Sequence, residues 1–193
     1  MTAEEQKQIA IAKSLQTEQG EVEKINKIAL SIDLAIFGFS ENTLKVLLIR
    51  SDLKKYKEQW SLLGDLIKPT EELDTAAYRV LRQRTGMDDV FLEQVHTFGE
   101  VKRHPAGRVV TIAYYSLINI EHHKLNILDN ELHWHDVKSV TNLAFDHQQI
   151  FETCYRRLQK RIPEHPLGFR KKKKKFSLRE LQNLYEAILD TKL

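Results

Sequence analysis

Three neighbouring positions on one predicted helix decide whether this chain can hold a catalytic metal ion. Residues 73–84 carry an apolar stripe with helical spacing, which predicts an amphipathic helix. Positions 80, 83 and 84 share one helical face, where three carboxylates would converge on Mg²⁺, a cation that prefers oxygen ligands. The sequence instead supplies Val80, Gln83 and Arg84. A valine, an amide and a guanidinium cannot supply such a set of ligands, and Arg84 would repel the ion, so this face of the helix is not expected to hold magnesium.

The residues around this helix resemble the Nudix box, whose pattern is G-x5-E-x7-R-E-U-x-E-E-x-G-U with U an aliphatic residue. Aligning Gly86 on the second glycine places Glu71 on the first glutamate and Arg79 on the arginine, and the aliphatic positions are filled by Leu81 and Met87. In this family the first glutamate and the arginine tie the preceding loop to the helix. The resemblance therefore implies that Glu71 and Arg79 keep the scaffold of the box.

Other parts of the pattern are missing. The three glutamates that grip magnesium in the family correspond to Val80, Gln83 and Arg84, and Asp65 replaces the first glycine, with Gly64 one residue too early. The resemblance thus implies a Nudix domain with no catalytic residues, no metal and no cofactor. An ordinary amphipathic helix is the alternative interpretation of the same stripe.

Two histidine pairs suggest zinc as a second chemistry. They are His122-His123 and the alternating His133 and His135. A closed zinc site needs four well-placed ligands, and the single cysteine, Cys154, lies on the apolar face of another predicted helix. Alternation along a strand would place His133 and His135 on one solvent face. We predict no metal site and a buried Cys154 thiol.

Composition limits the class of protein. The 193 residues, 41% hydrophobic and 30% charged, suit one medium domain with a smaller appendage. The longest apolar run is shorter than the roughly 20 residues that span a bilayer. One cysteine excludes an intramolecular disulfide and suits a reducing compartment. We predict a cytoplasmic protein without a membrane partner.

The order of elements predicts an α/β fold. Residues 1–27 are rich in Glu, Gln, Lys and Ala and predict an N-terminal helical arm. Residues 28–162 predict strands with β-branched and aromatic content, a hairpin turn at residues 40–42, a basic loop over residues 103–108 and two helices. The strand segments are residues 30–39, 44–49, 90–101, 109–120 and 131–137, and the helices are residues 73–84 and 147–162. This order fits a Nudix-like α/β/α sandwich with a mixed sheet.

The C-terminal part differs in charge. Residues 163–193 contain eight Lys and Arg against four Asp and Glu, most of them in a basic linker over residues 163–175. Residues 176–193 predict one more helix, with Ser177 as N-cap and Glu180 completing a capping box. Its apolar stripe is too large for an isolated helix, so it must dock on another element.

The whole arrangement resembles the NrtR family of Nudix-related transcriptional regulators. A Nudix-like domain, a Pro/Gly linker with basic residues and the segment F-S-L-x-x-L-Q-x-L-Y-E-A-I at residues 176–188 carry this resemblance over about residues 28–193. In the family this segment is the first helix of a winged helix-turn-helix. Residues 98–115 are similar to the branch that responds to L-arabinose. Family members continue with an arginine-rich recognition helix and a β-wing, so we expect only a partial winged helix-turn-helix in residues 176–193.

The resemblance implies a regulator that binds operator DNA, a small effector and a second copy of itself. The candidate DNA-binding residues are Arg170, Lys171, Lys172, Lys173, Lys174, Lys175, Ser177 and Arg179. The candidate effector-binding residues are Arg50, Trp60, Glu71, Arg84, Arg103 and Arg108. We expect a homodimer that senses a sugar or a sugar-nucleotide-like effector, with L-arabinose as one candidate.

Two other functions remain open. The first is a Nudix hydrolase acting on a nucleoside diphosphate derivative such as ADP-ribose, with its metal bound by carboxylates from Glu71, Glu72, Glu93 and Glu100. The second is an interaction module in which the N-terminal arm and the C-terminal helix dock on partners. Hydrolysis that depends on magnesium would distinguish the enzyme from both binding functions.

Overall fold

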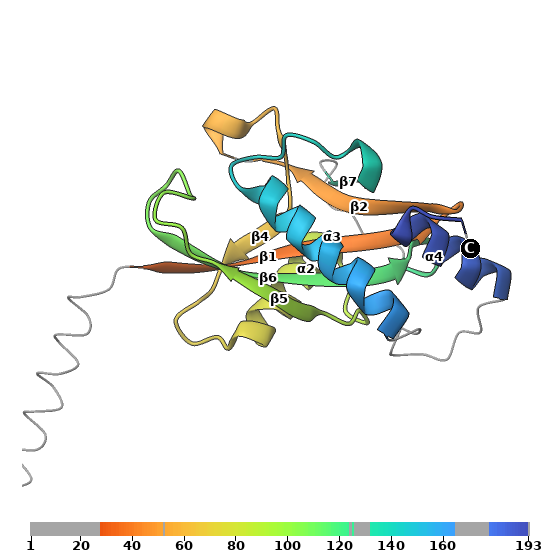
Figure 1. The fold of residues 1–193 in the computed structure, drawn as a ribbon. Helices are drawn as coiled ribbons and strands as arrows, with labels where there is room; N and C mark the ends of the chain where they lie inside the picture. The colour runs from red at the N-terminus through yellow and green to blue at the C-terminus, as the bar shows by residue number, and fades with distance from the viewer. Residues whose placement is uncertain (1–27, 52, 124, 126–131, 165–177, 193) are drawn as a thin grey trace, which may run out of the picture.

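A mixed β-sheet forms the centre of the molecule (Figure 1). The computed structural model describes residues 28–51, 53–123, 125, 132–164 and 178–192. Its strands are β1 (Ala29–Ser40), β2 (Thr43–Arg50), β3 (Trp60–Ser61), β4 (Leu63–Leu66), β5 (Glu93–Phe98), β6 (Val109–Asn119) and β7 (Leu132–Asp136). The helices are α2 (Leu73–Thr85), α3 (His147–Glu164) and α4 (Leu178–Leu189), with short 3₁₀ turns at Lys54–Tyr56, Ile120–His122 and Val137–Ser139.

The long strand β1 organises the sheet. It pairs with β6 in parallel, and every other strand pairing is antiparallel, so the predicted mixed sheet is confirmed. The C-terminal end of β1 pairs with β2, whereas its N-terminal half pairs with β4. Residues 60–66 therefore pass from β2, which β3 joins, to β1, which β4 joins. This crossing positions the residues that lead into the box.

Helices cover both faces of the sheet. Buried side chains of α2 pack with one face of β1 and β6, and those of α3 and α4 pack with the other. In Figure 1, α3 crosses in front of the sheet and α2 lies behind it. The alternation of β1 explains both cores, because successive side chains point to opposite faces. The predicted α/β/α sandwich is confirmed over the described residues.

The turn between β1 and β2 also agrees with the sequence. Glu41 and Asn42 have φ values of 50° and 57°. Two positive φ values are what a two-residue type I′ hairpin requires.

The prediction of a strand over residues 90–101 was wrong at both ends, because β5 covers only Glu93–Phe98. Beyond it, Arg108 Nη1 donates to the carbonyls of Gly99 and Glu100 at 2.7 and 3.0 Å, which holds the chain in a loop.

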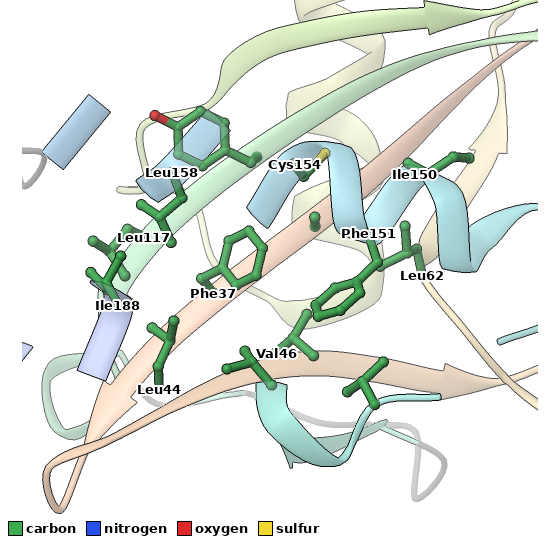
Figure 2. Close-up of a cluster of buried hydrophobic side chains, with 14 of the residues drawn as sticks. Phe37, Leu44, Val46, Leu62, Leu117, Ile150, Phe151, Cys154, Leu158 and Ile188 are labelled. Atoms are coloured by element: carbon green, nitrogen blue, oxygen red, sulfur yellow. The ribbon is translucent and has the colours of Figure 1, made fainter. Parts of the chain in front are cut away.

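The C-terminal helix α4 docks on the Nudix-like domain. Leu184 and Ile188 are 1% and 0% exposed and belong to the same core as Phe37 and Leu117. Figure 2 shows Ile188 beside Leu117 and Leu158. The predicted need for a docking partner is therefore confirmed, and the partner is the α3 face of the sheet.

Hydrogen bonds fix the end of α4 as well. Tyr155 Oη and Gln159 Nε2 both donate to the carbonyl of Ile188, at 3.1 and 3.0 Å.

The predicted arm over residues 1–27, most of the basic linker and Ser177 lie outside the described residues. Among the helices that are described, none has the length and apolar character needed to cross a membrane.

Candidate functional site

The loop before α2 is tied to the helix by one arginine. Arg79 donates from Nε and Nη2 to the two carboxylate oxygens of Glu71 at 2.6 and 3.0 Å. Its Nη1 bonds Asp65 at 2.9 Å, and its Nη2 also reaches the carbonyl of Leu66 at 2.7 Å. The Arg79 hydrogen bond, together with the backbone N–H of Lys68, lowers the pKa of Glu71. Glu71 and Arg79 thus make the contact that the box resemblance implied.

The three positions that the resemblance aligns with metal ligands differ from one another in environment. Val80 is fully buried in the core with Leu81, whereas Gln83 is exposed and accepts a hydrogen bond from Arg79 at 2.9 Å. Arg84 is half-buried and donates from Nη2 to the carbonyl of Gly64 at 3.3 Å. The burial of Val80 agrees with the apolar, core-facing stripe that the sequence predicts for this helix.

Gly64 sits where no larger residue fits. A Cβ at this position would clash with the carboxylate of Asp33, which lies opposite Gly64 in the β1–β4 pairing, and would be 2.9 Å from the carbonyl oxygen of Ile32. The glycine therefore lets β4 approach β1 closely. Its own carbonyl remains available to Arg84.

A second group of side chains surrounds Trp60. Arg50 lies opposite Trp60 in the β2–β3 pairing, and its guanidinium carbon is 3.9 Å from the centroid of the indole. His133 and His135 also contact the indole, with ring centroids at 5.3 and 4.4 Å. Burial lowers the pKa of His135, and its neighbour His133 adds to this effect. The prediction of one solvent face was wrong for His135, which is half-buried because it packs on Trp60.

The candidate arginines of the basic loop serve the fold. The side chain of Arg103 is only 1% exposed and forms a two-pronged ion pair with Asp146 at 2.6 and 2.8 Å. It also lies 3.7 Å from Asp33. Arg108 holds backbone carbonyls of the same loop. Arg103 is therefore held inside the fold, whereas Arg108 is half-buried and its hydrogen bonds lie at the surface of its own loop.

Sequence reasoning missed a buried polar group between β1, β3 and α3. Thr111 Oγ1 donates to Asp33 at 2.7 Å. His147 Nδ1 accepts the N–H of Leu62 at 2.9 Å and lies 2.8 Å from the hydroxyl of Ser61. Burial lowers the pKa of His147, although Asp33 opposes this shift. The signal was an aspartate inside the apolar run of β1.

Three further expectations from the sequence concern Cys154, metal ions and DNA. Cys154 is buried in the core, as predicted, and burial raises the pKa of its thiol to about 12. In the part of the chain that the structure describes, no group of three or more His, Cys, Asp or Glu side chains is arranged to hold a metal ion. Of the candidate DNA-binding residues only Arg179 is described, and it is exposed on α4.

The fold and the box have a counterpart among known families. The family described as NUDIX domain matches residues 30–155 of this chain. The chain therefore belongs to the Nudix domain family.

Individual relatives include a regulator and an enzyme. The chain is 33% identical over 165 residues to the ADPR-responsive transcriptional repressor NtrR of Acinetobacter baylyi, which covers 83% of this chain and 66% of the repressor. It is 25% identical over 125 residues to an ADP-ribose pyrophosphatase of Methanocaldococcus jannaschii, which covers 64% of this chain and 73% of the enzyme.

Solved structures of NrtR from Shewanella oneidensis share the fold. The protein superposes with a TM-score of 0.74 at 28% identity, over 86% of this chain and 79% of that one. Its Nudix domain complexed with ADP ribose superposes with a TM-score of 0.63 at 27% identity, over 70% of this chain and 92% of that one. Its complex with a 27mer DNA superposes with a TM-score of 0.73 at 26% identity, over 85% of this chain and 77% of that one. The predicted similarity to NrtR regulators is thereby supported.

Proposed function

We propose that this chain is the effector-sensing part of a transcriptional repressor of the NrtR type, and that it binds a nucleoside diphosphate sugar such as ADP-ribose without hydrolysing it. The environment of the box helix carries this proposal. Glu71 and Arg79 keep the loop in place, while Val80 lies in the core and Arg84 is bonded to a backbone carbonyl. The scaffold for a diphosphate is retained, and the carboxylates for a catalytic metal are replaced.

The class of effector is supported by the relatives. The Acinetobacter repressor is named for its response to ADPR, and the Nudix domain of the Shewanella regulator was solved with ADP ribose. Arg50, Trp60, Glu71 and Arg84 are the side chains we propose around such an effector. L-arabinose, which the similarity of residues 98–115 suggests, is the second effector to test.

A direct binding measurement tests this function. We expect isothermal titration calorimetry to detect ADP-ribose binding to the full chain, both with magnesium and with EDTA, and chromatography to detect no AMP after long incubation. L-arabinose should give no heat. Magnesium-dependent release of AMP that EDTA abolishes would instead establish a hydrolase.

The hydrolase remains the second candidate because the chain is similar to an ADP-ribose pyrophosphatase. Two of the four carboxylates that it would need are paired with arginines. Glu71 is paired with Arg79, and Glu93 bonds Arg161 at 3.2 Å. Glu72 and Glu100 are exposed and remain available to solvent. This distribution favours binding over catalysis.

DNA binding and dimerisation belong to the same proposal. The Shewanella regulator was solved with a 27mer DNA, which supports operator DNA as a partner of this chain. We propose that α4 is the first helix of a winged helix-turn-helix and that two copies associate, because such motifs read symmetric half-sites in pairs. Light scattering at micromolar concentration tests the dimer, and a monomer would contradict it.

A further inference from the structure

Arg84 differs from Arg79 in what surrounds it. Arg79 is engaged by Glu71, Asp65 and Gln83. Arg84 makes one hydrogen bond, to the Gly64 carbonyl, and no carboxylate among the described residues lies within ion-pairing distance of it. A half-buried guanidinium normally pairs with an anion, because partial burial removes water that would otherwise stabilise its charge.

The nearby carboxylates are held away from Arg84. Glu71 accepts two hydrogen bonds from Arg79 and one from the backbone of Lys68. Asp65 accepts from Arg79 with one oxygen and from the backbone N–H of Leu66 with the other. Arg79 therefore holds both carboxylates, which keep one negative charge in excess of Arg79, and neither of them forms an ion pair with Arg84.

The bond to Gly64 gives Arg84 a defined position. It joins the last turn of α2 to β4 across 20 residues of sequence. The guanidinium has five N–H donors in a planar fork, so one bond to a carbonyl leaves several donors for another acceptor. Planar forks of this kind match the oxygens of phosphate groups, which they bind through two parallel hydrogen bonds.

We propose that Arg84 binds a phosphate oxygen of the effector and supplies the positive charge that a metal ion supplies in catalytic members of the family. This inference rests on the proposed function, since it names the residue that receives the diphosphate. It also gives the diphosphate a counter-charge that is present without any divalent cation. Binding should therefore be insensitive to EDTA.

A matched pair of variants tests the role of Arg84 in the full chain. Arg84→Met removes the charge and keeps much of the side-chain volume, whereas Arg82→Met removes an exposed charge from the same last turn of α2. Both arginines feel the same helix dipole, so the comparison isolates the position of Arg84. Inorganic pyrophosphate and ADP-ribose are the probes, each titrated by calorimetry with magnesium and with EDTA.

We expect the wild-type protein and Arg82→Met to bind both probes equally well in the two buffers. Arg84→Met should weaken both roughly ten- to hundredfold, the usual value of a charge-assisted hydrogen bond. Thermal unfolding shows whether the variant is folded. If Arg84→Met does not fold, Arg84→Gln carries the test, because its amide can still donate to the Gly64 carbonyl without a charge.

The outcomes separate this inference from the proposed function. Unchanged ADP-ribose binding by Arg84→Met, or wild-type binding that needs magnesium, would overturn the role of Arg84 and leave the effector class standing. Pyrophosphate binding that depends on Arg84 without any ADP-ribose binding would support the anion site and overturn the effector class. If the wild-type protein binds neither probe, both proposals fail.

Discussion

Two arginines of the box region, Arg79 and Arg84, have different roles. Arg79 donates hydrogen bonds to Glu71, Asp65 and a backbone carbonyl, so it stabilises the loop. Arg84 donates one hydrogen bond to Gly64, and its other N–H groups are left to bind another acceptor. The two side chains are five residues apart in sequence but differ in chemistry, because only one of them has carboxylates within reach. Counting charges in the sequence could not have made this distinction.

The buried environment of Val80 makes a glutamate at this position costly. Val80→Glu places a carboxylate in a position with no exposure to solvent. We expect it to lower the free energy of unfolding by about 3–5 kcal/mol, the typical cost of an uncompensated buried charge. Gln83→Glu, on the exposed side of the helix beside Arg79, should change stability by less than about 0.5 kcal/mol. Urea denaturation of the two variants checks this, and equal effects would show that Val80 is not in the core.

His147 should make stability depend on pH. Its pKa in the folded protein lies below the ordinary value of 6.5, because burial disfavours the charged ring. The unfolded chain then binds the proton more readily than the folded chain, so stability is full above about pH 6.5 and is lost as the pH falls through the folded pKa. We expect the free energy of unfolding to fall more between about pH 8 and pH 5 in the wild-type protein than in His147→Gln. Parallel curves for the two proteins would contradict this assignment.

Among the helices and strands, the spacing of apolar residues predicted the type of element correctly wherever one side of the element is buried. The alternation in β1 and β6 and the stripe of α2 predicted strands and a helix close to their observed bounds. The strand predicted over residues 90–101 was too long, because apolar and β-branched residues continue past the point where pairing with β6 ends. Period alone contains no information about where a partner strand stops.

The candidate site was predicted less completely than the fold. The loop contact between Glu71 and Arg79 follows from a known pattern, whereas the inward direction of Arg103 depends on Asp146, a residue 43 positions away. The edge-to-face contact of His135 with Trp60 likewise requires the pairing of β7 with β2. Contacts of this kind are created by tertiary structure, so single-sequence reasoning assigned both side chains to solvent or to a ligand.

The close approach of β4 to β1 can be tested with two glycines. Gly64→Ala would bring a methyl group against the Asp33 carboxylate and the Ile32 carbonyl. We expect it to destabilise the protein by about 1–3 kcal/mol, as overpacking does, and to weaken ligand binding by shifting the carbonyl that holds Arg84. Gly99→Ala is the control, because its Cβ would meet only Val110 Cγ2 at 3.8 Å. Equal thermal stability of the two variants would argue against a tight crossing of β4.

At the scale of the whole molecule, the basic run over residues 170–175 makes a prediction about DNA. Lysines in such a run contact phosphates, and each neutralised phosphate adds about −0.9 to the slope of log K against log salt. Replacing residues 171–175 with alanine in a protein that contains a complete winged helix should flatten this slope and preserve sequence preference. Fluorescence anisotropy over a salt series measures both quantities.

Residues 1–193 should bind DNA weakly and without sequence preference, because the lysine run contacts phosphates, which carry no base information, and the apolar face of α4 is buried on the sheet. An unrelated duplex of equal length is the control in the same anisotropy assay. Tight, selective binding by this chain would show that its DNA-reading surface lies elsewhere.

The docking of α4 has a consequence for how the protein should be divided. Leu184 and Ile188 complete the apolar core around Phe37, Leu117 and Leu158. A fragment ending with α3 would lack Leu184 and Ile188 and would expose Phe37, Leu117 and Leu158 to water. Such a fragment should bind hydrophobic dyes, be cut readily by proteases and aggregate. The Nudix-like domain and α4 would unfold together as one cooperative unit, although the resemblance assigns them to different domains. A variant in which α4 no longer docks would therefore lower the stability of the Nudix-like domain itself.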